Sequence, residues 1–218
     1  MIVVIQCAAS KQDDAPSLRT ADGREVCFVA DPSSAPASGH PYARPDDMSG
    51  SGESWREQLR AYNEAPDANP LRLLRAYELY RPSVYQDLAD HVGTDRLYIL
   101  SAGWGLIPAT YMTPAYDITF SASADPWKRR RKSGRYDDFS MLPEDTREPV
   151  LFFGGNDYLP LFARLTRHLD APKIIPYRSA QTPDLPGATL VRFETERRTN
   201  WHYECAEAFM RGALDLPH

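Results

Sequence analysis

Polar and glycine residues follow several short apolar runs of the chain, where strands are expected to end. Four segments share this pattern: 6–11 (QCAASK), 101–106 (SAGWGL), 154–158 (GGNDY) and 177–179 (YRS). They contain hydroxyls, a lysine, an arginine, a carboxylate, aromatic rings and glycines that leave backbone amides open. Such groups suit a ligand that has an anionic group and a planar ring, such as a nucleotide.

The residue types predict a division of roles in such a site. Lys11 and Arg178 would hold the anionic group, and Trp104, between two glycines, would stack on the ring. Asp117 or Asp157 would act as acid, base or stabiliser of a cationic ribosyl centre. The predicted catalytic residues are therefore Asp117 and Asp157. The predicted substrate-binding residues are Ser10, Lys11, Ser101, Gly103, Trp104, Tyr116, Asn156, Tyr158 and Arg178.

Each of these residues also has a structural interpretation. Residues 10–11 would form an ordinary polar turn, and Cys7 would be a small buried residue at a strand end rather than a nucleophile. Asp117 would close a turn, and Asp157 would cap the helix that follows it. The glycines at 103 and 105 would let the backbone turn sharply. The sequence leaves both interpretations open.

A basic run at residues 127–135, WKRRRKSGR, places six cations in nine residues of a chain with a formal net charge of −5. Such a run can bind a nucleic-acid backbone or a polyphosphate, and its tryptophan can stack on a base. Alternatively, it is a solvated loop balanced by the acidic residues just beyond it. The nucleic-acid-binding residues under the first interpretation are Trp127, Lys128, Arg129, Arg130, Arg131, Lys132 and Arg135.

Several function classes are not expected. The negative net charge argues against a general nucleic-acid binder. The histidines lack HExxH spacing and the three cysteines form no CxxC pair, so neither a metal site nor a disulfide framework is predicted. A GxGxxG turn and a P-loop motif are absent, so no cofactor is predicted. The apolar runs are too short to span a membrane and the first residues do not resemble a signal peptide, which predicts a cytoplasmic protein.

The apolar patterns predict alternating strands and helices. Strands are expected at 2–6, 25–30, 97–101, 150–154, 173–176 and 189–194. Helices are expected at 54–64, 70–81, 83–91, 156–169 and 200–214, the last capped by Thr199 or Asn200. This order predicts a single α/β domain over residues 1–218, with a mixed or mostly parallel sheet flanked by helices. Residues 31–52, rich in proline, serine and glycine, are expected to form an insertion or a mobile lid.

Three separated motifs together resemble the YaaA-like family, named after a bacterial peroxide-stress protein, and its short phage and bacterial relatives. SAGWGLIP followed by TPAYDITF at 101–120 resembles the motif of that family, and CAASK at 7–11 and GGNDYLPLF at 154–162 are similar to two further elements. The resemblance implies a mixed α/β fold of the YaaA type and a link to nucleic acids. Members are associated with DNA binding and oxidative stress, and phage relatives with base modification. The chain departs from the pattern at 31–52 and at Ala115, which separates a Pro-Tyr pair.

Two functions are therefore predicted. The first is an enzyme that acts on a nucleotide or nucleobase, by glycosidic-bond or base-modification chemistry, in a pocket at the strand ends. The second is a non-catalytic DNA-binding stress protein that uses residues 128–135. The acidic net charge favours the enzyme.

Overall fold

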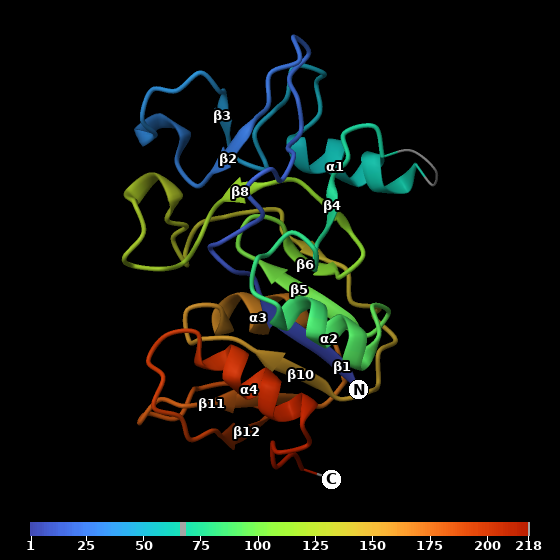
Figure 1. The fold of residues 1–218 in the computed structure, drawn as a ribbon, viewed down its shortest axis with the longest axis vertical. Helices are drawn as coiled ribbons and strands as arrows, with labels where there is room; N and C mark the ends of the chain where they lie inside the picture. Colours follow the sequence, from blue (N-terminus) through green and yellow to red (C-terminus); the bar gives the residue numbers. More distant parts are fainter. Residues whose placement is uncertain (66–68, 218) are drawn as a thin grey trace.

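The chain forms an α/β structure around a seven-stranded, mostly parallel sheet (Figure 1). The computed structural model describes residues 1–65 and 69–217. Within them the strand order is β12 (Ala188–Arg192), β11 (Lys173–Tyr177), β10 (Val150–Phe153), β1 (Ile2–Gln6), β5 (Leu97–Ser101), β6 (Gly105–Pro108) and β9 (Phe139–Ser140). Neighbouring strands pair in parallel except β5 and β6. The predicted α/β fold class is confirmed.

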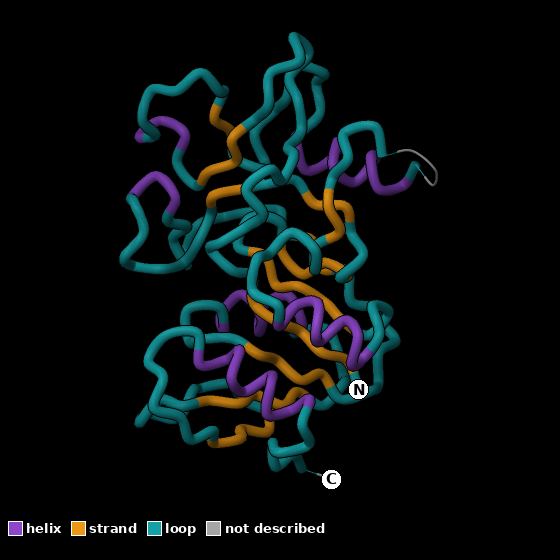
Figure 2. Tube along the Cα trace, viewed as in Figure 1, coloured by secondary structure: helices purple, strands orange, loops and turns teal. Residues whose placement is uncertain are grey.

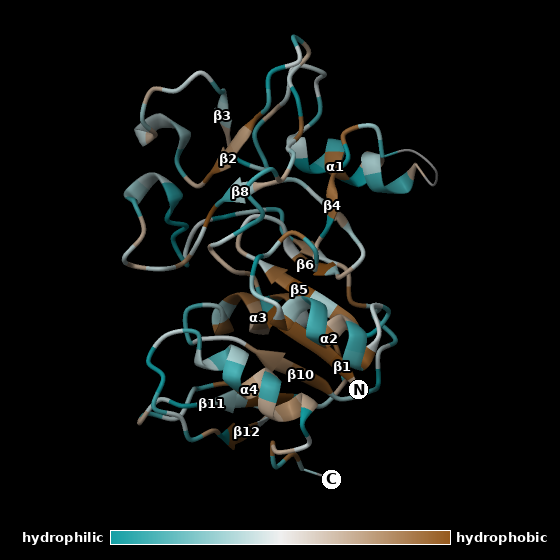
Figure 3. Cartoon of the chain, in the orientation of Figure 1, coloured by the Kyte–Doolittle hydropathy of each residue, from teal (hydrophilic) through white to brown (hydrophobic). Residues whose placement is uncertain are grey.

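Strand β1 lies at the centre of the sheet because it is apolar on both faces. Ile2 to Ile5 are buried, as is typical of a strand covered by helices on both sides. Val4 pairs in parallel with Phe152 on one side and with Tyr98 on the other. The apolar character of β1, β5 and β10 is visible in Figure 3. The carboxyl ends of these three strands therefore meet at one edge of the sheet, where ligands of such sheets bind.

Helices cover both faces of this sheet. Phe152 stacks on Phe162 of α3 (Leu159–Thr166), and Phe153 contacts Phe209 of α4 (Trp201–Met210). Because successive side chains of a strand point to opposite faces, α3 and α4 lie on opposite sides of β10. Helix α2 (Val84–Val92) packs beside α4. The helices expected at 83–91, 156–169 and 200–214 are therefore present, the last two in shorter form.

A second region, rich in loops, lies beyond β5 and β6 (Figure 2). It contains a small sheet in the order β3 (Tyr42–Ala43), β2 (Cys27–Val29) and β8 (Tyr116–Asp117), and a pair formed by β4 (Leu74–Arg75) and β7 (Met112–Thr113). It also contains α1 (Trp55–Glu64), whose start is fixed by a capping box between Ser54 and Glu57. The start expected for this helix is confirmed.

The segment 31–52 has more regular structure than its composition predicts. It contains a short 3₁₀ helix, η1 (Pro32–Ser34), and β3, which pairs in parallel with β2. Met48 forms a bridge with Ser54, and the Ser49 amide donates to the Glu53 carbonyl. The segment is thus part of the small sheet, and its closing over a ligand stays a prediction.

The prediction of a helix at 70–81 is wrong. The backbone amide of Leu73 donates to the Asn69 side chain at 2.8 Å, and that side chain donates back to the Leu73 carbonyl at 2.9 Å. Arg72 has a φ of 53°, which no α-helix tolerates. The apolar residues that suggested a helical stripe instead pack into the core around β4. An asparagine that forms a local turn has overridden the helical pattern.

The longest helices in the part of the chain that the structure describes have ten residues. None of them has the length and apolar character needed to cross a membrane.

Candidate functional site

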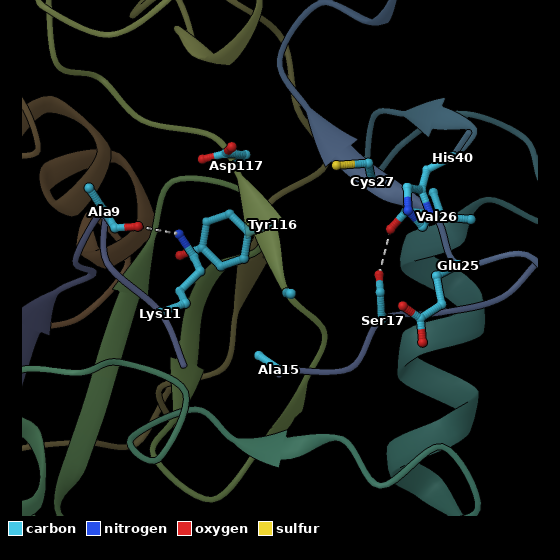
Figure 4. Close-up of a pocket in the computed structure, with 11 residues that line it drawn as sticks. Ala9, Lys11, Ala15, Ser17, Glu25, Val26, Cys27, His40, Tyr116 and Asp117 are labelled. Atoms are coloured by element: carbon cyan, nitrogen blue, oxygen red, sulfur yellow. Dashed lines mark hydrogen bonds between the residues drawn. The ribbon is translucent and has the colours of Figure 1, made fainter. Parts of the chain in front are cut away.

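A cavity of about 350 Å³ opens beside the turn that follows β1. This volume is in the range of sites that bind small molecules. The cavity lies between that turn and the small sheet, and Figure 4 shows its side chains. We call it the Lys11 cavity. Its walls include Ala9, Lys11, Cys27, His40, Tyr116 and Asp117.

Lys11 lies in the turn that follows β1, where its ammonium contacts backbone carbonyls and an aromatic ring. Its ammonium donates to the carbonyls of Ala8 and Ala9, both at 3.3 Å, and lies 4.2 Å from the centre of the Tyr116 ring. Burial lowers the pKa of Lys11, although nearby Cys7 and Asp117 act in the opposite direction. A lysine with a lowered pKa has more of its neutral amine near pH 7, and this form can accept a proton or attack an electrophilic carbon.

Tyr116 forms the floor beneath Lys11. It is 4% exposed, and its hydroxyl lies 2.8 Å from the hydroxyl of Tyr80. Burial raises the pKa of both phenols well above the ordinary value. Both hydroxyls therefore stay protonated, and each can donate a hydrogen bond.

Cys7 lies behind this floor, at the end of β1. Its sulfur is 3.3 Å from the Tyr158 hydroxyl and accepts a hydrogen bond from the Ala102 amide at 3.3 Å. Only 3% of the residue is exposed. These contacts agree with the structural interpretation of Cys7 as a small buried residue at a strand end.

The two candidate catalytic carboxylates lie at different cavities, and each is paired with a lysine of the basic run. Asp117 lines the Lys11 cavity and lies 2.8 Å from Lys128. The hydrogen bond that Lys128 donates to Asp117 raises the pKa of Lys128. Asp157 lies 2.8 Å from Lys132 and lines a second cavity. The sequence could not distinguish the two carboxylates, whereas the structure places only Asp117 beside Lys11.

The second cavity, of about 280 Å³, lies at the amino end of α4, and we call it the α4 cavity. Ala9 lines both cavities, so they lie on two sides of the turn after β1. The walls of the α4 cavity include Gln6, Asp157, Tyr158, Arg198 and His202. Among the predicted substrate-binding residues, Lys11 and Tyr116 thus lie at one cavity and Tyr158 at the other.

The prediction that Trp104 is an exposed stacking surface is wrong. The indole is fully buried and packs edge-to-face on Phe28 at 5.1 Å. Ser101 is buried too, and its hydroxyl accepts hydrogen bonds from the Gly103 and Trp104 amides at 3.2 and 3.0 Å. A side chain at position 103 would meet the Tyr116 ring, and Gly105 has a φ of +95°. The glycines therefore fold this turn inward and place the indole in the core.

Three further predicted residues line neither cavity. Ser10 is exposed, and its carbonyl accepts from the Arg81 amide at 3.3 Å. Arg178 donates to the carbonyl of Arg197. Asn156 lines a separate cavity beside α3. Arg178 lies away from the Lys11 cavity because β11, which it follows, is separated from β1 by β10.

The basic run is largely committed to contacts within the chain. Arg130 is 4% exposed, donates to both oxygens of Asp138 at 2.8 and 2.6 Å, and donates to the Ala102 carbonyl at 2.7 Å. Trp127 is half-buried and packs edge-on against Tyr42. The expectation of a fully solvated run is therefore wrong at Arg130. Four of its cations are exposed, namely Arg129, Arg131, Lys132 and Arg135, and of these Lys132 is paired with Asp157.

Several residues at or beside the cavities could not be predicted from the sequence. His40 lies in the expected lid, and Tyr80 lies in the segment wrongly expected to be helical. His202 lies in the first turn of α4. No local spacing connects these residues with β1, because the fold brings them together from distant segments. Among the described residues, no cluster of three or more His, Cys, Asp or Glu could hold a metal ion.

Comparison of the chain with models of known protein families gives no match, and comparison with curated protein sequences gives none either.

Proposed function

We propose that the chain is an enzyme that acts on a nucleotide or nucleobase bound in the Lys11 cavity. The observation that carries this proposal is the grouping of Lys11, Tyr116 and Asp117 on the walls of one accessible cavity at a strand end. Lys11 has a lowered pKa and lies over the Tyr116 ring. Groups that can transfer protons and have shifted pKa values are typical of reaction centres.

The remaining walls suit a planar ring with polar edges. Ala15, Val26 and Ala115 supply apolar surface, and His40 and Glu25 supply polar groups. A nucleobase has the same division, with apolar faces and hydrogen-bonding edges. A cytoplasmic location belongs to this proposal, because all three cysteines are free thiols.

Lys11 and Asp117 can supply and take up the protons that cleavage of a glycosidic bond requires. As the bond from the ribose carbon to the base breaks, its electron pair leaves with the base, and the Lys11 ammonium gives that base a proton. Water then adds to the ribose carbon and gives a proton to Asp117, which returns it to Lys11. A lowered pKa favours this step, because it makes the ammonium a stronger acid.

The experiment combines binding with turnover. The full chain is incubated with nucleosides, nucleoside monophosphates and free bases, and thermal shift and product release are measured. We expect a shift with one of these classes, because a ligand specific for the folded state raises stability. Lys11→Met and Asp117→Asn are each expected to lower turnover at least roughly a hundredfold, as is usual for loss of an acid–base group.

Lys173→Met is the matched control, because this lysine donates to the Leu169 carbonyl and lines neither cavity. It should keep its turnover. The proposal fails if no nucleotide, nucleoside or base shifts the melting temperature, or if both cavity variants keep full activity.

The DNA-binding function remains a second proposal, supported by the exposed Arg129, Arg131 and Arg135. Exchanging these three for glutamine should remove salt-sensitive affinity for a short duplex. Unchanged affinity at low salt would exclude this function for the basic run.

A further inference from the structure

A small cavity beside the first turn of α3 is lined mainly by cations. Its volume is about 80 Å³, well below the range of about 300–1,000 Å³ typical of sites for whole small molecules, so it admits only a small group. Of the described residues, Arg130 and Lys132 from the basic run line it, together with Arg164 from α3 and one carboxylate, Asp157. We call it the Arg164 cavity.

The buried carboxylate of Asp138 brings two of these cations together. Its Oδ2 accepts a hydrogen bond from Arg130 at 2.6 Å and another from Arg164. Two guanidinium groups thus meet at one oxygen, and one carboxylate can compensate the charge of only one of them. Lys132 and Asp157 form a separate pair at 2.8 Å that is neutral as a whole. Among the described residues, three cations face two carboxylates, which leaves one positive charge uncompensated beside the cavity.

The cavity keeps accessible hydrogen-bond donors. The side chains of Arg164 and Lys132 are 45% and 51% exposed. Within the described residues, Arg164 donates only through Nη2, to Asp138, and Lys132 contacts only Asp157. The other donors of this guanidinium and this ammonium can therefore reach a ligand. Arg130 differs, because both of its NH₂ groups donate within the chain, so it supplies charge rather than contacts.

We propose that the Arg164 cavity is a subsite for a phosphate group. Guanidinium groups match the spacing of phosphate oxygens and bind them through paired hydrogen bonds. A phosphate carries more negative charge at pH 7 than a carboxylate, so it interacts more strongly with the uncompensated cation. Arg164 and Lys132 are the donors of this subsite. The subsite does not depend on the proposed function, because the phosphate can be a free ion as well as part of a nucleotide.

The first test is a calorimetric titration of the full chain with inorganic phosphate at pH 7.5 and low ionic strength. Wild type should bind, and Arg164→Gln should weaken binding roughly tenfold or more, as expected for loss of a charge-assisted hydrogen bond. This variant should fold, because Arg130 still compensates Asp138, and its melting temperature checks this. Arg167→Gln is the matched control. It removes the same charge from an exposed position three residues further along, which does not line the cavity.

Asp157 provides a second test in which binding should become tighter. Asp157→Asn removes the carboxylate from the cavity wall and releases Lys132, so phosphate should bind roughly threefold more tightly or better. Asp170→Asn is the control, because Asp170 is an exposed carboxylate that does not line the cavity. It should change the dissociation constant by less than about twofold, since salt screens distant surface charges.

NMR spectroscopy localises the bound phosphate without relying on a variant. The Nε–H resonance of Arg164 should move on addition of phosphate, whereas that of Arg167 should stay in place. Absence of phosphate binding overturns the subsite. Equal weakening by the two arginine variants, or weaker binding by Asp157→Asn, also overturns it.

A nucleoside and its 5′-monophosphate identify the source of the phosphate. Tighter binding of the monophosphate, lost in Arg164→Gln, supports a nucleotide as the ligand. If inorganic phosphate binds but the monophosphate binds no better than the nucleoside, the subsite stands with the free ion as its ligand. Lys11→Met should leave the affinity for inorganic phosphate unchanged, because Lys11 does not line this cavity. Failure of the proposed function and failure of the subsite are therefore separate results.

Discussion

The pair formed by Arg130 and Asp138 is expected to hold the basic run in the core rather than to bind a ligand. Both side chains are almost fully buried, and the Asp138 carboxylate accepts two hydrogen bonds from Arg130 and one from Arg164. The Arg130 guanidinium also lies 3.7 Å from the centre of the Tyr136 ring. Removing one partner of such a pair leaves a buried charge without compensation, which costs about 3–5 kcal/mol.

Asp138→Ala should therefore destabilise the chain by about 3–5 kcal/mol, and Arg130→Met by an amount near the lower end, because Arg164 still compensates Asp138. For a chain of this size, the melting temperature should fall by about 6–20 °C. Urea unfolding of the two single variants and of the double variant measures the coupling. The double variant should lose less than the sum of the single losses.

Arg131→Met and Asp137→Ala are the matched controls, because both residues are exposed neighbours in the same segment. Each should change the free energy of unfolding by less than about 0.5 kcal/mol. Additive losses in the double variant would refute the reasoning. So would an Arg130→Met protein with unchanged stability that loses only affinity for DNA.

Three further predictions concern stability. Burial lowers the pKa of His202 to about 4 in the folded state, whereas in the unfolded chain this histidine takes up a proton below about pH 6.5, so the free energy of unfolding should fall as the pH drops from 6.5 to about 4. In urea unfolding, His202→Phe should lose about 2–3 kcal/mol less stability than wild type between pH 7.5 and 4.5. Trp104→Ala should cost about 3–5 kcal/mol in chemical denaturation because the indole is fully buried, and a loss near zero would contradict a core role. Ser54→Ala should cost about 1 kcal/mol through loss of the capping box, which thermal unfolding detects against exposed Ser123→Ala.

Five strands of the large sheet and most helices could be predicted because their signals are local, whereas β6 and β9 were not expected. Runs of apolar residues marked β1, β5 and β10, and Ser54, as a capping residue, marked the start of α1. The prediction of a helix at 70–81 was wrong because the Asn69 side chain forms hydrogen bonds with the Leu73 backbone, in competition with the hydrogen bonds of a helix. Propensity gives no warning of such a contact, since its strength depends on the surrounding packing.

The site was less predictable than the fold because its parts come from distant segments. Lys11 could be chosen from its place after the first strand, and Asp117 from its apolar context. Neither choice indicated that Tyr80 would contact Tyr116, or that Nε2 of the buried His202 would have no hydrogen-bond partner among the described residues. The prediction for Trp104 was wrong for a related reason. Its flanking glycines permit the turn to point inward as readily as outward, and the indole packs inward against Phe28, which is distant in sequence.

The basic run forms ion pairs with a carboxylate at each of the two cavities. Lys128 compensates Asp117 at the Lys11 cavity, and Lys132 compensates Asp157 at the α4 cavity. Arg130, between them in sequence, is fixed in the core by Asp138. Without these lysines, each cavity would present an uncompensated carboxylate and repel an anionic ligand. Ion pairs within the chain thus account for Lys128, Arg130 and Lys132, and the proposal of DNA binding depends on the exposed Arg129, Arg131 and Arg135.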